Sequence, residues 1–383
     1  MTAQSVRKIL TRDFILVFFA QFTFIIVCHI LIPTLPIYLS RLGSGETEIG
    51  VLIGSFGVSS LIFRPFVGRA LLKIPEKSFM IIGALLFALT SSAYLFAPPF
   101  WPFLMVRVFQ GIGLAFFNTA AFTLIANISP ETHRGQSLSY FFLAQNISLA
   151  LAPAVGMLLI NHFSFALLFW ACLGVSLSSL FITHKLGKRQ IPPVADFPHE
   201  DGLFLNGKAL PTSIVSFCFY FIWGGMATFF PLYAIKNGVA NPGLFFTALS
   251  ILLILSRALG GRILDLYSKE KVILYFFSIC VLSVIVLALS RTLPMFILAG
   301  VIWGVGAGLF NPAIMACTLD RAGSSSRGPA MGTYTAFSDL GVSLGPATMG
   351  IIIPFTGYPT MFLCLALVGV INLAYFHVFV RKR

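Results

Sequence analysis

Charged side chains are scarce in this sequence of 383 residues. Only 10% of the residues are Asp, Glu, Lys or Arg, 58% are hydrophobic, and the mean hydropathy is +0.95. A soluble globular domain carries about 25% charged residues, so this composition excludes that class. The chain also lacks a P-loop of the form GxxxxGK[ST]. An ATP-driven pump is therefore not expected.

Cysteine and histidine are also few. The six cysteines all lie in apolar segments and none has CxxC spacing, which argues against disulfides and metal ligation. His29 is the only histidine well inside an apolar run, and no second His or carboxylate lies one helical turn away. We therefore expect no metal site and no cofactor.

Long apolar runs are what the sequence has instead. Each is long enough to cross about 30 Å of hydrocarbon as a helix. The first lacks a small-residue cleavage site, so it is expected to be a retained helix rather than a signal peptide. Twelve runs are predicted, at about 14–38, 47–68, 78–97, 101–127, 136–160, 164–184, 212–235, 242–264, 271–290, 293–319, 329–354 and 358–379.

The net charge of +13 reflects topology rather than nucleic-acid binding. Most of the 25 Lys and Arg lie in the termini or the even-numbered loops, where we count Arg64 and Arg257. This asymmetry is the positive-inside pattern and predicts that both termini are cytoplasmic, in what we expect to be a bacterial inner membrane. We therefore expect the lipid bilayer as a partner of the chain, and no nucleic acid.

The sequence contains an internal repeat. FQGIGLAFFN at 109–118 aligns with IWGVGAGLFN at 302–311 when 193 is added to each number, and near the starts of the halves the offset is 195, as for Gly43 and Gly238. The sequence therefore predicts two homologous six-helix bundles, residues 1–184 and 211–383. A polar cytoplasmic linker over 185–210 joins them. In a membrane protein such a duplication is typical of a transporter.

Three motifs accompany the repeat. Arg107, Gln110, Gly111 and Gly113 form R-x-x-Q-G-x-G in the fourth run. The loop after the second run reads Gly68-Arg69-Ala70-Leu71-Leu72, and its copy, Gly261-Arg262-Ile263-Leu264-Asp265, has an Asp where the first has Leu72. The eleventh run contains G-x8-G-x3-G-P, at Gly332, Gly341, Gly345 and Pro346, and the fifth run has the same spacing with other small residues.

On these motifs the whole chain resembles the major facilitator superfamily, and within it the twelve-helix drug:proton antiporters, of the arabinose-efflux-permease-like kind. The resemblance implies an all-α membrane fold whose first, fourth, seventh and tenth helices line a central cavity. It also implies gating roles for Gly68, Arg69, Gly261, Arg262 and Asp265. The G-x8-G-x3-G-P signature normally lies in the fifth helix of the antiporters, so its place in the eleventh weakens the inference of export.

Polar and aromatic side chains on these implied cavity helices are the candidate substrate site. A buried Arg is costly unless it is paired or faces water, so Arg107 is a functional candidate, with a structural tether as the alternative. Helical spacing puts Gln110 and Asn118 on the stripe of Arg107. Other candidates are His29, Trp223, Trp303 and Asn311, with interhelical hydrogen bonding as the alternative for the two Asn and a neutral packed imidazole for His29.

Proton coupling requires a titratable group inside the membrane. Asp339 is the acid that fits, about 11 residues into the eleventh run and so roughly 16 Å deep, while its repeat equivalent is Asn146. His29 and Arg107 are further candidates for coupling, and a permanent structural pair is the alternative for Asp339. The first run has no acid beyond Asp13, unlike many drug antiporters.

The sequence favours a monomeric, proton-coupled exporter of a small amphipathic molecule that works by alternating access, and not an enzyme. An importer or uniporter of an anionic metabolite or metal chelate, anchored by Arg107, is an alternative. Lipid handling on the same scaffold is another.

Overall fold

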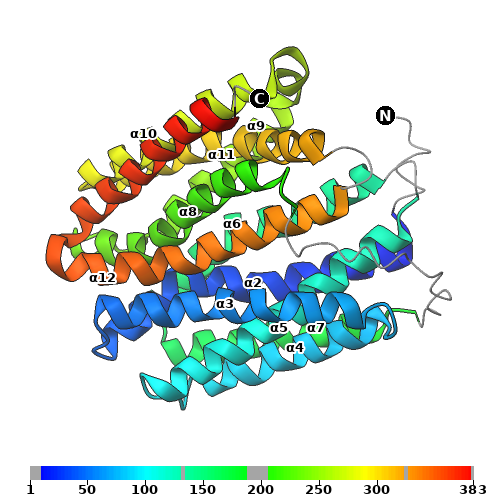
Figure 1. The fold of residues 1–383 in the computed structure, drawn as a ribbon. Helices are drawn as coiled ribbons and strands as arrows, with labels where there is room; N and C mark the ends of the chain where they lie inside the picture. The colour runs from blue at the N-terminus through cyan, green and yellow to red at the C-terminus, as the bar shows by residue number, and fades with distance from the viewer. Residues whose placement is uncertain (1–9, 131–133, 188–205, 323–326, 381–383) are drawn as a thin grey trace. The chain divides into compact units, whose positions relative to one another are not determined.

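The computed structural model describes residues 10–130, 134–187, 206–322 and 327–380, apart from some side chains within helices. The described part consists of helices and short connections (Figure 1). The helices are α2 (Arg12–Arg41), α3 (Glu46–Ala70), α4 (Glu76–Ala93), α5 (Trp101–Ile128), α6 (Arg134–His162), α7 (Phe165–His184), α8 (Leu210–Lys236), α9 (Gly243–Leu266), α10 (Lys269–Leu289), α11 (Leu293–Ala322) and α12 (Arg327–Tyr375), followed by a short π-helix, η3 (Phe376–Val380).

The predicted all-α membrane fold is confirmed. Among the described residues, ten helices are long and apolar enough to cross a membrane, and α9 adds a shorter apolar stretch, Gly243–Ala258. α12 is two helices merged across Gly357, whose φ of 78° breaks the helical path, so it accounts for the last two predicted runs. After this kink the red segment turns back in the opposite direction to the orange one (Figure 1).

The chain divides into two compact units. The first comprises Met1–Leu31 and Val58–His199, and the second comprises Ile32–Gly57 and Glu200–Arg383. The predicted linker 185–210 lies largely outside the described residues.

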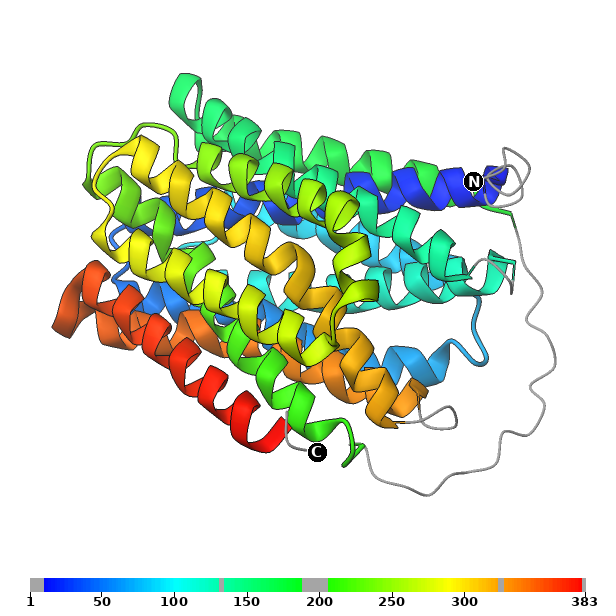
Figure 2. The ribbon, with the colours of Figure 1, turned by 90° about the horizontal axis from the view of Figure 1, so that it is seen from above.

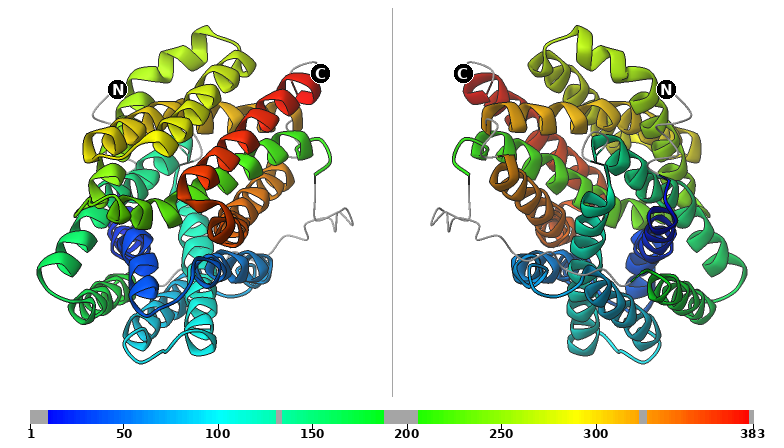
Figure 3. Two further views of the ribbon diagram at one scale, coloured as in Figure 1. Left: turned by 90° about the vertical axis from the view of Figure 1, so that its left-hand side faces the viewer. Right: turned by 90° about the vertical axis from the view of Figure 1, so that its right-hand side faces the viewer.

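The repeat is visible inside each unit. In the first, α4 packs against both α5 and α7; in the second, its equivalent α10 packs against both α11 and α12 (Figures 2 and 3). Each third helix therefore lies between the equivalents of the fourth and the sixth, as a sequence duplication requires.

Two aligned glycines end the first helix of each repeat in the same way. Gly43 and Gly238 have φ of 87° and 80°, the left-handed region that only glycine enters without cost. The following amides, Ser44 N and Val239 N, donate back to Leu39 O and Ala234 O at 3.1 and 3.0 Å. These bonds satisfy carbonyls at the helix end, so the glycines explain why α2 and α8 stop there.

Small residues bring α8 and α12 into backbone contact. A Cβ added at Gly341 or Gly345 would lie 2.3 or 2.2 Å from the carbonyl oxygens of Phe217 and Phe221. No side chain fits in these places, so the G-x8-G-x3-G-P spacing in α12 matches the surface of α8.

Candidate functional site

Arg107 is enclosed by side chains of the first unit. It lies on α5, is 5% exposed, and its Nη1 donates to Gln110 Oε1 at 2.7 Å and to Tyr94 Oη at 3.4 Å. Tyr94 also donates to Gln110 at 2.6 Å, and its ring packs against Phe103 and Phe169. The network ties α5 to the end of α4 and to α7, which is the arrangement of a structural tether; a role for Arg107 in transport stays a prediction.

The two aligned asparagines each join the first and fourth helices of their repeat. Gln21 Nε2 on α2 donates to Asn118 Oδ1 at 2.9 Å, and Tyr220 Oη on α8 donates to Asn311 Oδ1 at 3.3 Å. Asn118 is 8% exposed, whereas Asn311 is half-buried. Both therefore make the interhelical bonds that the sequence left as the alternative to substrate contact.

His29 contacts the fifth helix of its repeat. Its Nδ1 lies 2.9 Å from Ser148 Oγ on α6, and the residue is half-buried. The contact fixes the ring between two helices. In a neutral imidazole one ring nitrogen donates and the other accepts, so Nε2 can accept when Nδ1 donates to Ser148 and can donate when Nδ1 accepts.

The aromatic candidates form a stack in the second unit. Trp303 on α11 is 1% exposed and lies parallel to Phe219 and Trp223 of α8, with ring centroids 5.3 and 6.0 Å apart. Trp223 is half-buried, so of the two tryptophans it has the more accessible ring. The buried ring of Trp303 packs against the ring of Trp223.

Asp339 lies in a polar cluster of the second unit. It is half-buried, twelve residues beyond the first residue of α12. The hydroxyl of Tyr220 on α8 lies within electrostatic range of Asp339 and Tyr334 on α12 and of Arg257 on α9. The structure thus brings Asp339 and Asn311, both sequence candidates, to one place, and adds three residues that were not candidates, Tyr220, Tyr334 and Arg257.

Arg257 is the functional candidate that the sequence reading missed. The charge pattern counted it with a cytoplasmic loop, although it falls within the predicted run 242–264. The structure places it inside α9, which continues nine residues beyond it to Leu266, or about 14 Å. Arginine can stay inside a helix when its stem packs on apolar surface and its head finds polar groups. The alignment of Arg257 with Arg64, another arginine inside a helix, was the available signal.

The two copies of the gating-loop motif differ in what the structure describes. Gly68 and Arg69 lie exposed at the end of α3, and Leu72, where the motif has Asp, is also exposed. Gly261, Arg262 and Asp265 lie within α9, and the side chains of Arg262 and Asp265 lie outside the described part of the structure.

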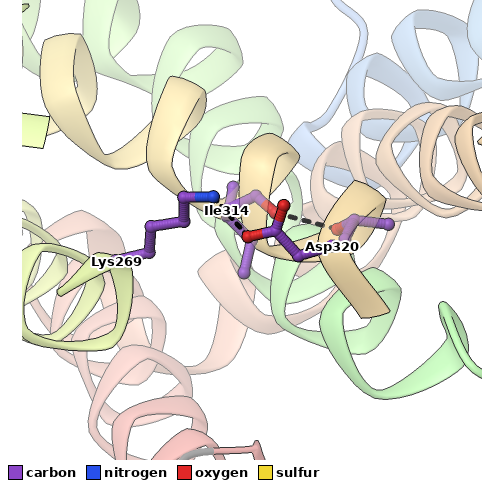
Figure 4. Close-up of polar contacts among 4 residues, drawn as sticks. Lys269, Ile314 and Asp320 are labelled. Atoms are coloured by element: carbon purple, nitrogen blue, oxygen red, sulfur yellow. Dashed lines mark hydrogen bonds and ion pairs between the residues drawn. The ribbon is translucent and has the colours of Figure 1, made fainter. Parts of the chain in front are cut away.

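Polar contacts connect the residues next to both loops to neighbouring helices. In the first repeat, the buried Glu76 accepts from Asn127 at 2.7 Å, and Lys77 donates to His184 O and Leu186 O at 2.6 Å, at the end of α7. In the second repeat, Lys269 pairs with Asp320 (Figure 4). An offset of 193 carries Glu76 to Lys269 and Asn127 to Asp320, so one place in the fold holds two different polar pairs.

A glycine-lined contact joins the start of α3 to α12 within the second unit. A Cβ at Gly50 or Gly54 would lie 2.3 or 2.4 Å from the carbonyl oxygens of Pro346 and Ser343. At the same end, Tyr358 Oη donates to Glu46 Oε1 at 3.2 Å. Thr47 Oγ1 also donates to Gly350 O at 3.0 Å, so the contact combines close backbone packing with hydrogen bonds at this end.

Comparison with known proteins agrees with this architecture. The family model of the Major Facilitator Superfamily matches residues 17–322 and 212–383. The staphylopine export protein of Staphylococcus aureus is 26% identical over 89% of this chain and 90% of its own length. The quinolone resistance protein NorA of the same species is 22% identical over the same shares.

Solved structures show the same fold at lower identity. The nucleoside transporter NupG superposes with a TM-score of 0.76 at 16% identity, over 97% of this chain and 100% of that one. The human organic anion transporter MFSD10 superposes with a TM-score of 0.70 at 16% identity, over 95% and 98%. These likenesses concern the arrangement of helices.

Proposed function

Because the chain belongs to the Major Facilitator Superfamily and is a membrane transporter, we propose that it exports a small amphipathic molecule by proton-coupled alternating access. The observation that carries the direction is its similarity, along 89% of its length, to a staphylopine export protein and a quinolone resistance protein. The positive-inside charge pattern supports cytoplasmic termini in a bacterial inner membrane.

Asp339 is the proposed coupling group. A carboxyl group half-buried in the middle of a membrane helix, beside the hydroxyl of Tyr220, can hold a proton in one state of the transporter and release it in the other. The α3–α12 contact supports the movement: a glycine-lined surface can part and close as one state replaces the other.

Transport into everted vesicles tests this proposal. With an imposed pH gradient and a fluorescent quinolone as the test substrate, the native protein is expected to accumulate the quinolone. Asp339→Asn is expected to abolish gradient-driven accumulation but to keep exchange of quinolone across the membrane without a gradient. Glu48→Gln, which removes an exposed acid from the same compact unit, is the matched control and is expected to behave like the native protein.

Two results would contradict the proposal. Full gradient-driven accumulation by Asp339→Asn would remove Asp339 as the coupling group. Accumulation only in right-side-out vesicles would replace export by import, the alternative in which an anionic metabolite or metal chelate is the substrate.

A further inference from the structure

The polar cluster of the second unit contains a cation that proton coupling does not use. Arg257 is half-buried inside α9, and its Nε is buried without a hydrogen-bond partner among the described residues. A guanidinium inside a membrane helix is costly, and an unused donor on it raises that cost. This residue therefore calls for a ligand outside the protein's own described bonds.

The groups around Arg257 are mostly neutral hydroxyls held in place by three helices. Arg257 interacts electrostatically with Tyr220 and Tyr334. Tyr220 is fixed by its bond to Asn311, and Tyr334 by side-chain bonds to Ser216 and Ser338. Asp339, which also acts on Tyr220, is the acid described within this cluster. A cation surrounded in this way can receive an anion, and the Tyr220 hydroxyl becomes an additional donor when it turns from Asn311 to the anion.

The geometry of the donors selects the kind of anion. A guanidinium presents its N–H groups in a planar fork that matches a carboxylate with two parallel bonds. Trp223 lies three residues after Tyr220, on the same face of α8 one turn away, with an accessible ring supported by Trp303. An apolar or aromatic body next to the carboxylate would pack on that ring.

We propose that Arg257 and Tyr220 bind the carboxylate of an aromatic organic acid whose ring packs against Trp223. This proposal rests on the proposed function, since it names the chemical class of the exported molecule. It assigns substrate recognition to the second unit, on a residue distinct from the coupling group Asp339.

Equilibrium binding to the full chain in lipid nanodiscs tests the proposal without any gradient. The probes are dansylglycine and its neutral amide, which share the ring and differ in the carboxylate, and fluorescence anisotropy gives the Kd. The native protein is expected to bind the acid more tightly than the amide. Arg257→Gln is expected to weaken binding of the acid about 10- to 100-fold and to change binding of the amide less than about twofold.

Two further variants complete the experiment. Arg257→Lys keeps the charge without the fork and is expected to fall between the native protein and Arg257→Gln. Lys208→Gln removes an exposed cation from the same half and is expected to change neither Kd. Thermal unfolding of each variant in the same nanodiscs checks that it is folded.

Equal affinity of the native protein for acid and amide, no binding of the acid, or an equal loss for both probes in Arg257→Gln and Arg257→Lys would overturn the site. The vesicle experiment fails separately. Export without a preference for the acid would overturn only the Arg257 site. Import, or transport that ignores the pH gradient, together with acid binding through Arg257, would overturn only the proposed function.

Discussion

The first and fifth helices of each repeat meet in chemically different ways. In the first repeat, His29 on α2 contacts Ser148 on α6 through side chains, at 2.9 Å. In the second, the aligned positions are Gly224 on α8 and Gly341 on α12, where an added Cβ would lie 2.4 and 2.3 Å from backbone oxygens of the facing helix. One sequence spacing thus supports a polar side-chain contact in one half and backbone-to-backbone packing in the other.

The difference shows what a duplication preserves. Spacing fixes which positions of two helices face each other, and the residue types then decide how far apart the helices are. Two glycines let α8 and α12 touch along their backbones. Between α2 and α6 the side chains of His29 and Ser148 fill the corresponding space and meet through a hydrogen bond.

The largest effect is expected from adding a methyl group between α8 and α12, the glycine-packed pair of helices. In Gly345→Ala the new Cβ would lie 2.2 Å from Phe221 O and 2.9 Å from Gly225 N, which are backbone atoms that cannot turn away. The helices must separate, at a cost of about 1–3 kcal/mol, and the thermal midpoint in detergent is expected to fall by several degrees.

Gly332→Ala is the matched control on the same helix. Nothing lies within 4 Å of a Cβ added there, so the change is expected to be neutral or to stabilise by up to about 1 kcal/mol through helix propensity. If both variants lower the midpoint equally, close packing of α8 on α12 is not what the second half depends on.

The sequence predicted the fold better than the site, for a physical reason. Hydrophobic runs and the repeat are properties of length and spacing, and the repeat aligned Gly43 with Gly238, which the structure places at the ends of two helices. A membrane helix is apolar on all sides, so its sequence does not specify which face meets a neighbour. For this reason the sequence left open whether Arg107 acts in transport or as a structural tether. The structure shows that it bonds to Tyr94 and Gln110 of its own unit.

A double-mutant cycle measures the polar contact of the first half. His29→Ala, Ser148→Ala and the double variant are expected to show a coupling energy of about 0.5–1.5 kcal/mol, because each single change breaks the same hydrogen bond. Thermal unfolding in one detergent at a fixed pH is the measurement. Additive effects would mean that the two side chains act independently, and the contrast with the glycine-packed pair would then rest on packing alone.

The smallest effect is expected from the more exposed of the two polar pairs beside the gating loops, which are Glu76 with Asn127 and Lys269 with Asp320. Glu76 is buried and its bond with Asn127 is a charge-assisted one, whereas the Lys269 and Asp320 side chains are 36% and 62% exposed. Water and salt screen an exposed pair, so Asp320→Asn is expected to cost less than about 1 kcal/mol, and less still at high salt.

Asn127→Ala leaves the Glu76 carboxylate buried without this donor and is expected to cost more, about 1–2 kcal/mol, with little change as salt is raised. Thermal midpoints at low and high salt separate the two cases. Equal costs with equal salt dependence would show that the charges of the two pairs, and not their burial, determine how much each pair contributes to stability.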